Sequence, residues 1–188
     1  MRTYVLLFLF LIFAAANGFS QTSRINDSLH HQLYVAKTDT AKVWAMHDLS
    51  FSYLVSNADS AMWYAQMALE LSKKVAFIRG EIRSMNDVGN VMQYGGNSGA
   101  ALQILLEALQ KAEALNDIPM QAICIGNIAI VYLSQGDYRQ AKKYNFAALN
   151  IDIANHDTLY QAIDCENLSE TYLKNNQPDS ALFYGNQS

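Results

Sequence analysis

Proline is nearly absent from this sequence, with two residues in 188, and charged side chains make up only 16% of it. Disordered chains are poor in hydrophobic residues and rich in charge and proline. Here 51% of the residues are hydrophobic, which excludes a long disordered chain. The length is typical of a single folded domain.

Basic residues are also scarce. The chain has 13 Lys and Arg against 17 Asp and Glu, so it offers no strongly positive surface to nucleic acid or to an anionic membrane. Two basic pairs, Lys73-Lys74 and Lys142-Lys143, stand alone in the sequence, which is typical of solvated helix surface. The composition therefore predicts a protein that does not bind nucleic acid.

The N-terminal apolar run at 4–16 has thirteen residues and is too short to cross a bilayer, which needs about 20. Small residues at Gly18 and Ser20 suit a signal-peptidase site before Gln21, and the alanines at 14–16 offer a second one. We predict a signal peptide over the first twenty residues, and hence an exported protein that is periplasmic or membrane-associated. An uncleaved anchor or a buried first helix is the alternative.

Cysteine is rare as well, with two residues, Cys124 and Cys165. Export would place both in an oxidising compartment. Each lies among apolar residues early in a predicted helical segment, which favours two buried free thiols. A disulfide between them is the alternative, and it requires their Cα atoms to lie within about 7 Å.

The sequence also lacks the converging reactive groups that an enzyme needs. Its histidines are dispersed along the chain: His30, His31, His47 and His156. Asp27 and His31 lie one helical turn apart, but they give two metal ligands without a third. The glycines of 95–99 lack the Gly-Lys-Ser/Thr of a phosphate-binding loop, and no nucleophile or kinase motif occurs. We therefore predict no enzymatic activity in this chain, no cofactor and no metal site.

What the sequence does contain is an internal repeat of forty residues. Alanines recur at this spacing in two sets: Ala61, Ala101, Ala141 and Ala181, and Ala68, Ala108 and Ala148. Within a unit the two alanines are seven residues apart, which is two helical turns. They therefore lie on one helix face, where a neighbouring backbone comes close.

A second pattern precedes each alanine pair. It consists of an amide or acid, a branched apolar residue, a small residue, and an aromatic residue or Met three positions further on. The four copies begin at Asp48, Asp87, Asn127 and Asn167, and we assign these residues to hydrogen bonding between units. Stretches rich in Gly, Asn, Asp and Pro separate the two patterns and suit the end of one helix and the start of the next. Each unit is therefore predicted to be a helical hairpin.

Stacked hairpins form an all-α solenoid, because one hairpin cannot bury its packing face alone. Ahead of the repeats, Ile25, Leu29, Leu33 and Ala36 lie on one stripe, which predicts a lead-in helix that caps the array. The predicted organisation is signal peptide 1–20, capping helix 21–38, repeat 1 at 39–77, repeat 2 at 78–117, repeat 3 at 118–157 and a truncated repeat 4 at 158–188.

The fourth unit is incomplete in this sequence. The chain ends two turns into the second helix of the unit, which leaves Leu182 and Phe183 without a following unit. An isolated helix of two turns is marginal in water. We expect either fraying from Pro178 onward or self-association through this open edge, and we expect the chain to be the front of a longer protein.

These patterns resemble the tetratricopeptide repeat, which combines Leu-Gly or Leu-Ala, a Tyr, a Gly-Asp-Tyr turn and two alanines in the second helix. The third unit matches best, with NIAIVYLSQGDYRQAKKYNFAAL at 127–149, and the resemblance covers residues 40–188. It implies a right-handed α-solenoid of helix-turn-helix repeats. The period is forty rather than the usual 34 or so, and we expect the added residues to lengthen the second helix. Such long units look like the arrays at the front of exported bacterial sensor histidine kinases.

In arrays of this family, the first helices of the stacked units line a concave groove in which a peptide lies. The inward-facing candidates here are Trp44, His47, Phe51, Arg83, Asn86, Asn90, Gln93, Ile130, Glu166, Glu170 and Lys174. Some members of the family grip a C-terminal carboxylate with Lys and Asn on successive first helices. Arg83, Asn86 and Asn90 lie on a single helix, which disfavours such a clamp.

The resemblance implies an exported, non-catalytic interaction module that binds a peptide or protein partner in its groove. The alternative is the N-terminal sensing region of a longer membrane signalling protein, such as a sensor histidine kinase, whose catalytic part lies outside these 188 residues. Contact with a membrane would then come only through a downstream segment.

Overall fold

The computed structural model describes residues 24–188. The predicted signal peptide lies outside this range. A helix at 24–35 leads into the other helices, and no strand occurs in the part of the chain that the structure describes. The helix bounds are α2 Asp39–Tyr53, α3 Ala58–Lys74, α4 Ile78–Tyr94, α5 Ser98–Ala114, α6 Ile118–Ser134, α7 Tyr138–Ala154, α8 Thr158–Lys174 and α9 Pro178–Gly185. The prediction of an all-α solenoid is confirmed.

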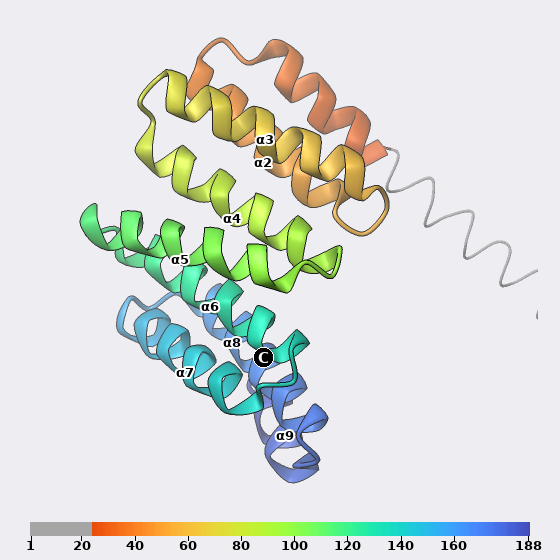
Figure 1. Cartoon of the computed structure of the whole chain (residues 1–188), viewed down its shortest axis with the longest axis vertical. Coiled ribbons are helices and arrows are strands. Elements are labelled where there is room, and N and C mark those ends of the chain that lie inside the picture. The colour runs from red at the N-terminus through yellow and green to blue at the C-terminus, as the bar shows by residue number, and fades with distance from the viewer. Residues whose placement is uncertain (1–23) are drawn as a thin grey trace, which may run out of the picture.

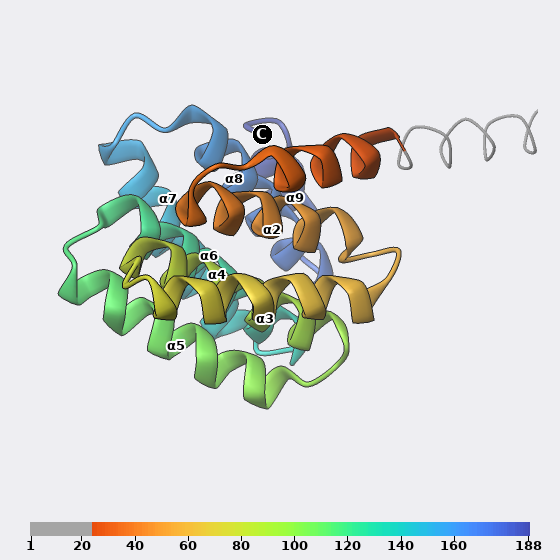
Figure 2. The ribbon, with the colours of Figure 1, turned by 90° about the horizontal axis from the view of Figure 1, so that it is seen from above.

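Consecutive helices pair as hairpins, and the hairpins stack in sequence order (Figure 1). Seen from above, they lie over one another (Figure 2). The first helices α4, α6 and α8 begin forty residues apart. Helices α4, α5, α6 and α7 all have 17 residues. The added length of the unit is therefore not confined to the second helix, because helices of equal length cover each other's packing faces along their whole extent.

The loops share one backbone conformation that recurs every twenty residues, which is half of the forty-residue period. Each helix from α3 to α8 is followed by one residue of positive φ, at twenty-residue spacing: Ala76, Gly96, Asn116, Gly136, His156 and Asn176. In each loop the N–H of this residue and that of the next residue bond to the preceding helix, as those of Gly136 and Asp137 do with the carbonyls of Leu133 and Tyr132, both at 3.0 Å. The Asp137 side chain then caps the next helix by accepting from the Gln140 amide at 3.0 Å. One loop geometry thus serves the turns within hairpins and the turns between them.

The repeated alanines line the helix interfaces. All seven are buried, with at most 6% of the residue exposed, which confirms their predicted role. In three units a tyrosine from each helix stacks across the hairpin, with ring centroids 5.4–5.9 Å apart. One of these pairs, Tyr172 with Tyr184, holds α9 against α8, where Ser169 Oγ also donates to the Ala181 carbonyl at 2.8 Å. Leu182 and Phe183 are exposed on α9.

The lead-in helix covers the first hairpin. Leu33 packs against the cluster formed by Val43, Met46 and Ala68, and His30 Nε2 lies 3.1 Å from the hydroxyl of Tyr53. The open face of the first unit is thereby packed against another helix, which a solenoid requires at its end.

Both cysteines are buried and free, as predicted. Burial raises the pKa of the Cys124 thiol to about 11 and also raises the pKa of Cys165. Among residues 24–188 no helix combines the length and apolar character needed to cross a membrane. Nor do these residues bring together three His, Cys, Asp or Glu side chains that could hold a metal ion.

Candidate functional site: a groove across the first helices

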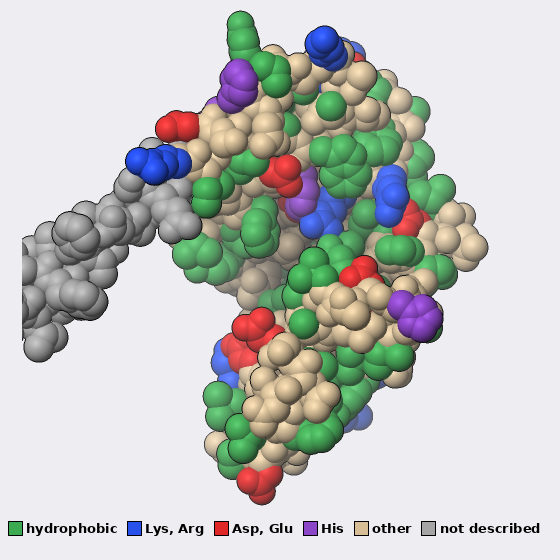
Figure 3. Space-filling view, turned by 180° about the vertical axis from the view of Figure 1, so that it is seen from behind, with side chains coloured by type: hydrophobic (Ala, Val, Ile, Leu, Met, Phe, Trp, Pro, Cys, Tyr) green, Lys and Arg blue, Asp and Glu red, His purple; other side chains and the backbone are tan. Residues whose placement is uncertain are grey.

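The first helices of all four hairpins contribute to one cavity of about 400 Å³, here called the groove. Its lining residues are Trp44, His47, Arg79, Arg83, Pro119, Met120, Ile123, Asp157 and Tyr160. They come from α2, α4, α6 and the start of α8. Figure 3 shows a hollow bordered by hydrophobic, basic and histidine side chains. A ligand in the groove would therefore touch every repeat unit.

Three polar side chains form a chain of hydrogen bonds between α2 and α4. His47 Nδ1 lies 2.8 Å and 2.9 Å from the two carboxylate oxygens of Asp87. On the other side of the ring, Arg83 Nε and Nη2 lie 3.2 Å and 3.0 Å from His47 Nε2. Because arginine has no acceptor, His47 Nε2 must accept. The proton of the neutral ring is therefore assigned to Nδ1, which donates it to Asp87.

This chain of hydrogen bonds orients the Arg83 guanidinium. Five N–H donors lie in the plane of a guanidinium, and His47 engages only the Nε and Nη2 side of it. The rest of the donor fork suits a carboxylate, which arginine binds strongly. Trp44 stands edge-on to His47, with ring centroids 6.2 Å apart, and 36% of it is exposed. The groove thus places an oriented cation beside an accessible aromatic ring.

A second arginine of the groove is neutralised within the protein. Arg79 Nε lies 2.9 Å from Asp117 Oδ2, and Asp117 also caps α6 by accepting from the amide of Met120 at 3.2 Å. This pair fixes α4 against the start of α6. Arg83 is therefore the basic side chain of the groove that lacks a carboxylate partner within the described residues.

The structure places the predicted groove residues in different environments. Trp44, His47 and Arg83 line the groove. Asn86 differs from the expectation, because it is only 1% exposed. Its Nδ2 donates to the Ile82 carbonyl and to Cys124 Sγ, and its Oδ1 accepts from Asn127. Asn86 therefore joins two hairpins and does not face a ligand.

The remaining candidates lie outside the groove cavity. Asn90 and Gln93 are half-buried on α4, Ile130 lines a smaller cavity, and Phe51, Glu166, Glu170 and Lys174 are exposed. Glu170 and Lys174 form an ion pair with each other at 2.8 Å. The acidic residues Glu166 and Glu170, which were expected in the groove, are thus not part of this cavity.

Sequence reasoning missed six groove residues: Arg79, Pro119, Met120, Ile123, Asp157 and Tyr160. A signal existed for one of them, because Ile123 lies one period after Arg83. Applying each inward-facing repeat position to every unit would have found Ile123. Arg79 and Asp157 lie at helix starts, where the repeat pattern carries no such information.

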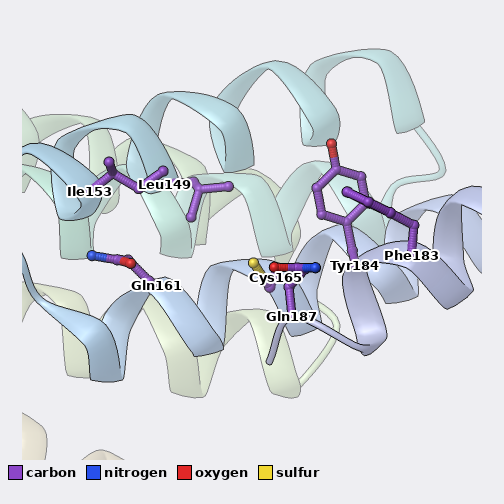
Figure 4. A pocket seen from close by; sticks show the side chains of 7 residues that line it. All are labelled: Leu149, Ile153, Gln161, Cys165, Phe183, Tyr184 and Gln187. Carbon is purple, nitrogen blue, oxygen red and sulfur yellow. The ribbon is translucent and has the colours of Figure 1, made fainter.

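A second cavity of about 230 Å³ lies among α7, α8 and α9 (Figure 4). Its lining residues are Leu149, Ile153, Gln161, Cys165, Phe183, Tyr184 and Gln187. The thiol of Cys165 lines this cavity, and burial raises its pKa. Because the thiolate is the reactive form of cysteine, burial does not activate this thiol.

Comparisons with protein-family models and with curated protein sequences find no match for this chain. Solved structures do match. A Rap protein complexed with competence and sporulation factor superposes with a TM-score of 0.76 at 22% identity over 92% of this chain and 50% of its own. BtubC from P. vanneervenii gives 0.66 at 16% identity, over 91% of this chain and 73% of its own.

A putative kinesin light chain from Podosopora anserina with nearly identical TPR-like repeats gives a TM-score of 0.55 at 14% identity, over 92% of this chain and 86% of its own. The present chain spans about half the length of the Rap chain that it matches. At these identities the likeness shows the fold, which is a tetratricopeptide-like helical array.

Proposed function

We propose that this protein is a non-catalytic scaffold that binds a peptide or protein partner in the groove. The observation that carries the proposal is Arg83, held by His47 in a cavity of about 400 Å³ to which four repeat units contribute. Extended concave surfaces are the usual binding surfaces of helical solenoids. The structure of a Rap protein with its competence and sporulation factor, in a similar fold, supports the same use here.

The chemistry of the groove indicates what the partner presents. Arg83 suits an acidic side chain or a terminal carboxylate, and the exposed ring of Trp44 suits an apolar side chain next to it. Tyr160, in the first turn of α8, adds a second aromatic side chain to the lining. A peptide segment with an acidic residue close to an apolar one fits this arrangement.

The test begins with peptides selected from a random displayed library on the purified protein, whose affinities are then measured by calorimetry. We expect Arg83→Ala to weaken binding about tenfold to a hundredfold, as loss of a charged hydrogen bond of about 1.5–3 kcal/mol does. Trp44→Ala should weaken it by at least about tenfold. Trp63→Ala is the matched control, because Trp63 is an exposed tryptophan on α3 outside the groove.

The control should leave the affinity within about twofold, since its side chain lies on a second helix. Peptides that bind both groove variants as tightly as the parent protein, and lose affinity only in Trp63→Ala, would place the binding surface elsewhere. Melting temperatures of the variants separate loss of the groove from loss of the fold.

Export is also proposed, from the apolar run and small residues within 1–20. Sequencing the N-terminus of the protein recovered free of membrane tests it, and an intact Met1 would contradict it.

The second candidate function is the sensing region of a longer membrane signalling protein, supported by the likeness of the long units to those of sensor kinases. A transmembrane stretch and a phospho-accepting histidine block encoded after codon 188 would support that candidate.

A further inference from the structure

Adjacent first helices are joined by polar side chains at one repeat position. Between the first and second hairpins His47 donates to Asp87 at 2.8 Å. Between the second and third, Asn127 donates to Asn86 at 2.9 Å. Asp87 and Asn127 thus have the bridging role predicted for them. The corresponding pair between the third and fourth hairpins is Gly126 with Asn167, and glycine has no side chain with which to complete the bridge.

A side chain at position 126 would also lie near Asp164. In the preceding junction Asn86 Nδ2 also donates to Cys124 Sγ at 3.1 Å. One period later the position of Cys124 is taken by Asp164, whose Oδ2 is buried and has no hydrogen-bond partner within residues 24–188. A Cβ added to Gly126 would lie 3.7 Å from Asp164 Oδ1. The third junction therefore lacks the donor of the second, at the place where a buried acceptor needs one.

A second buried carboxyl accompanies Asp164. Asp152 of α7 and Asp164 of α8 are each 4% exposed. Burial, together with the neighbouring carboxyl of Asp152, raises the pKa of Asp164 to about 8. One repeat earlier the two positions are Ala112 and Cys124, which pack in an apolar cluster. The fold itself therefore does not require carboxyl groups at this junction.

The space beside Gly126 is a cavity of about 60 Å³, here called the Gly126 pocket. Its polar lining residues are Asn127, Asp152, Tyr160, Asp164 and Asn167. Two of its residues, Ile123 and Tyr160, also line the groove, so the pocket adjoins the proposed peptide site. We propose that the Gly126 pocket binds a primary ammonium group, such as a lysine side chain or the amino terminus of a peptide in the groove. This inference rests on the proposed function.

An ammonium group fits the pocket in donors, charge and size. It has three N–H donors, and the acceptor that most needs one is the buried Oδ2 of Asp164. Its positive charge is also attracted to the neighbouring carboxyl groups of Asp152 and Asp164, whereas a neutral amide brings no charge to them. The ammonium is also compact, unlike the planar fork of a guanidinium. A peptide would then offer a carboxylate to Arg83 and an ammonium to Asp164.

The pocket can be tested without any peptide. Propylammonium chloride is titrated into the ¹⁵N-labelled protein, and the amide of Gly126 and the side-chain amides of Asn127 and Asn167 are followed by NMR. We expect saturable shifts with a dissociation constant on the order of a few millimolar, as befits a ligand of four heavy atoms. Tetramethylammonium has the charge but no N–H donor, so it should give no saturable shift.

Two variants copy the preceding junction and should abolish the response. Gly126→Asn restores the side chain found at Asn86 and fills the pocket, and the 3.7 Å spacing to Asp164 Oδ1 leaves room for its Cβ. D152A/D164C restores the pair Ala112 and Cys124 and removes the acceptors. Each should weaken propylammonium binding at least about tenfold.

Equal shifts in Gly126→Asn, or equal shifts with tetramethylammonium or potassium chloride, would overturn the proposal. Trp63→Ala, which changes an exposed residue outside both the groove and the pocket, should leave the response unchanged. Failure of the peptide experiment with an intact propylammonium response would therefore refute the proposed function alone, and the reverse outcome would refute the pocket alone.

Discussion

Six loops of the array each depend on one residue with positive φ. Glycine adopts this conformation without steric strain, whereas a Cβ costs about 1–2 kcal/mol there. Gly96 and Gly136 are the two glycines among the six positions. Ala76 is the least suited of the others, because it has neither the freedom of glycine nor the polar side chain that helps asparagine. The loop between the first two hairpins therefore holds avoidable strain.

We expect Ala76→Gly to stabilise the protein by about 0.5–1 kcal/mol, the relief of strain less the greater entropy of glycine in the unfolded chain. Gly136→Ala should destabilise it by about 1 kcal/mol. Both positions are exposed, and a Cβ on Gly136 would meet no atom within 4 Å, so neither change alters packing. Urea unfolding followed by circular dichroism measures both.

Gly99→Ala is the control for this pair of changes. Gly99 lies in the first turn of α5 with a φ in the ordinary range, and a Cβ there would also meet nothing within 4 Å. The same chemical change should therefore be stabilising, by up to about 1 kcal/mol, through helix propensity. Equal signs for Gly99→Ala and Gly136→Ala would show that the backbone conformation is not the deciding factor.

One pair of facing positions recurs where the two helices of each hairpin meet. A Cβ on Gly89 would lie 2.7 Å from Leu105 Cγ, and one on Gly185 would lie 3.2 Å from Ser169 Oγ. By repeat position the other two pairs are Ser50 with Ala65 and Ala129 with Asn145. The first helix thus carries a small residue at this position in every hairpin, and its partner on the second helix ranges from glycine in α9 to leucine in α5.

The close contact between these two positions predicts that the stability effects of substitutions at Gly89 and Leu105 are strongly coupled. Gly89→Ala should cost about 1–3 kcal/mol by overpacking against Leu105, which is fully buried. Leu105→Ala should cost about 2–5 kcal/mol by leaving a cavity. The double variant restores a small-on-small pair like Ser50 with Ala65, so it should be more stable than the sum of the two changes by at least about 1 kcal/mol.

Equilibrium urea unfolding of the four proteins of this cycle gives the coupling. Gly99→Ala combined with Leu105→Ala serves as the reference cycle, because a Cβ at position 99 would meet no atom within 4 Å and so would not contact Leu105. Its effects should add within about 0.5 kcal/mol. Additivity in the Gly89 cycle as well would contradict the packing described for this hairpin.

At the scale of the whole molecule, the forty-residue spacing of alanines predicted the array, because a small side chain such as alanine lets two helix backbones approach closely. The groove was harder to predict. Arg83 and Asn86 are three residues apart and so lie about 60° from each other around α4. A rotation of the unit by that amount decides which of the two faces the ligand and which is buried against α6. That rotation is set by packing between neighbouring units, so it cannot be inferred from the sequence of one unit alone.

The buried carboxyl pair was missed for a different reason. Aspartate is normally exposed, and Asp152 and Asp164 occupy positions that are Ala112 and Cys124 in the preceding unit. The departure from the repeat was visible in the sequence. Its meaning was not, because only the structure shows that the two side chains meet across α7 and α8.

This pair makes the stability of the whole array depend on pH, since each unit of a solenoid is stabilised by the interface with its neighbour. Burial raises the pKa of Asp164 to about 8 and also raises that of Asp152, to which the charge of Asp157 contributes. An unfolded aspartate has a pKa of about 3.9. Between about pH 4 and pH 8 the native state therefore binds more protons than the unfolded state, so the free energy of unfolding falls as pH rises.

The expected loss between about pH 5 and pH 8 is on the order of a few kcal/mol, measured as the shift of the urea midpoint. D152A/D164C should remove most of this slope and raise stability at the higher pH, because it replaces the buried charge with the apolar pair of the preceding junction. The α6 side of the junction contributes Gly126, Asn127 and apolar residues, none of which titrates, and burial raises the pKa of Cys165 on α8 above its ordinary value of about 8.5. An unchanged slope in the variant would show that the fourth hairpin does not depend on the protonation of these two residues.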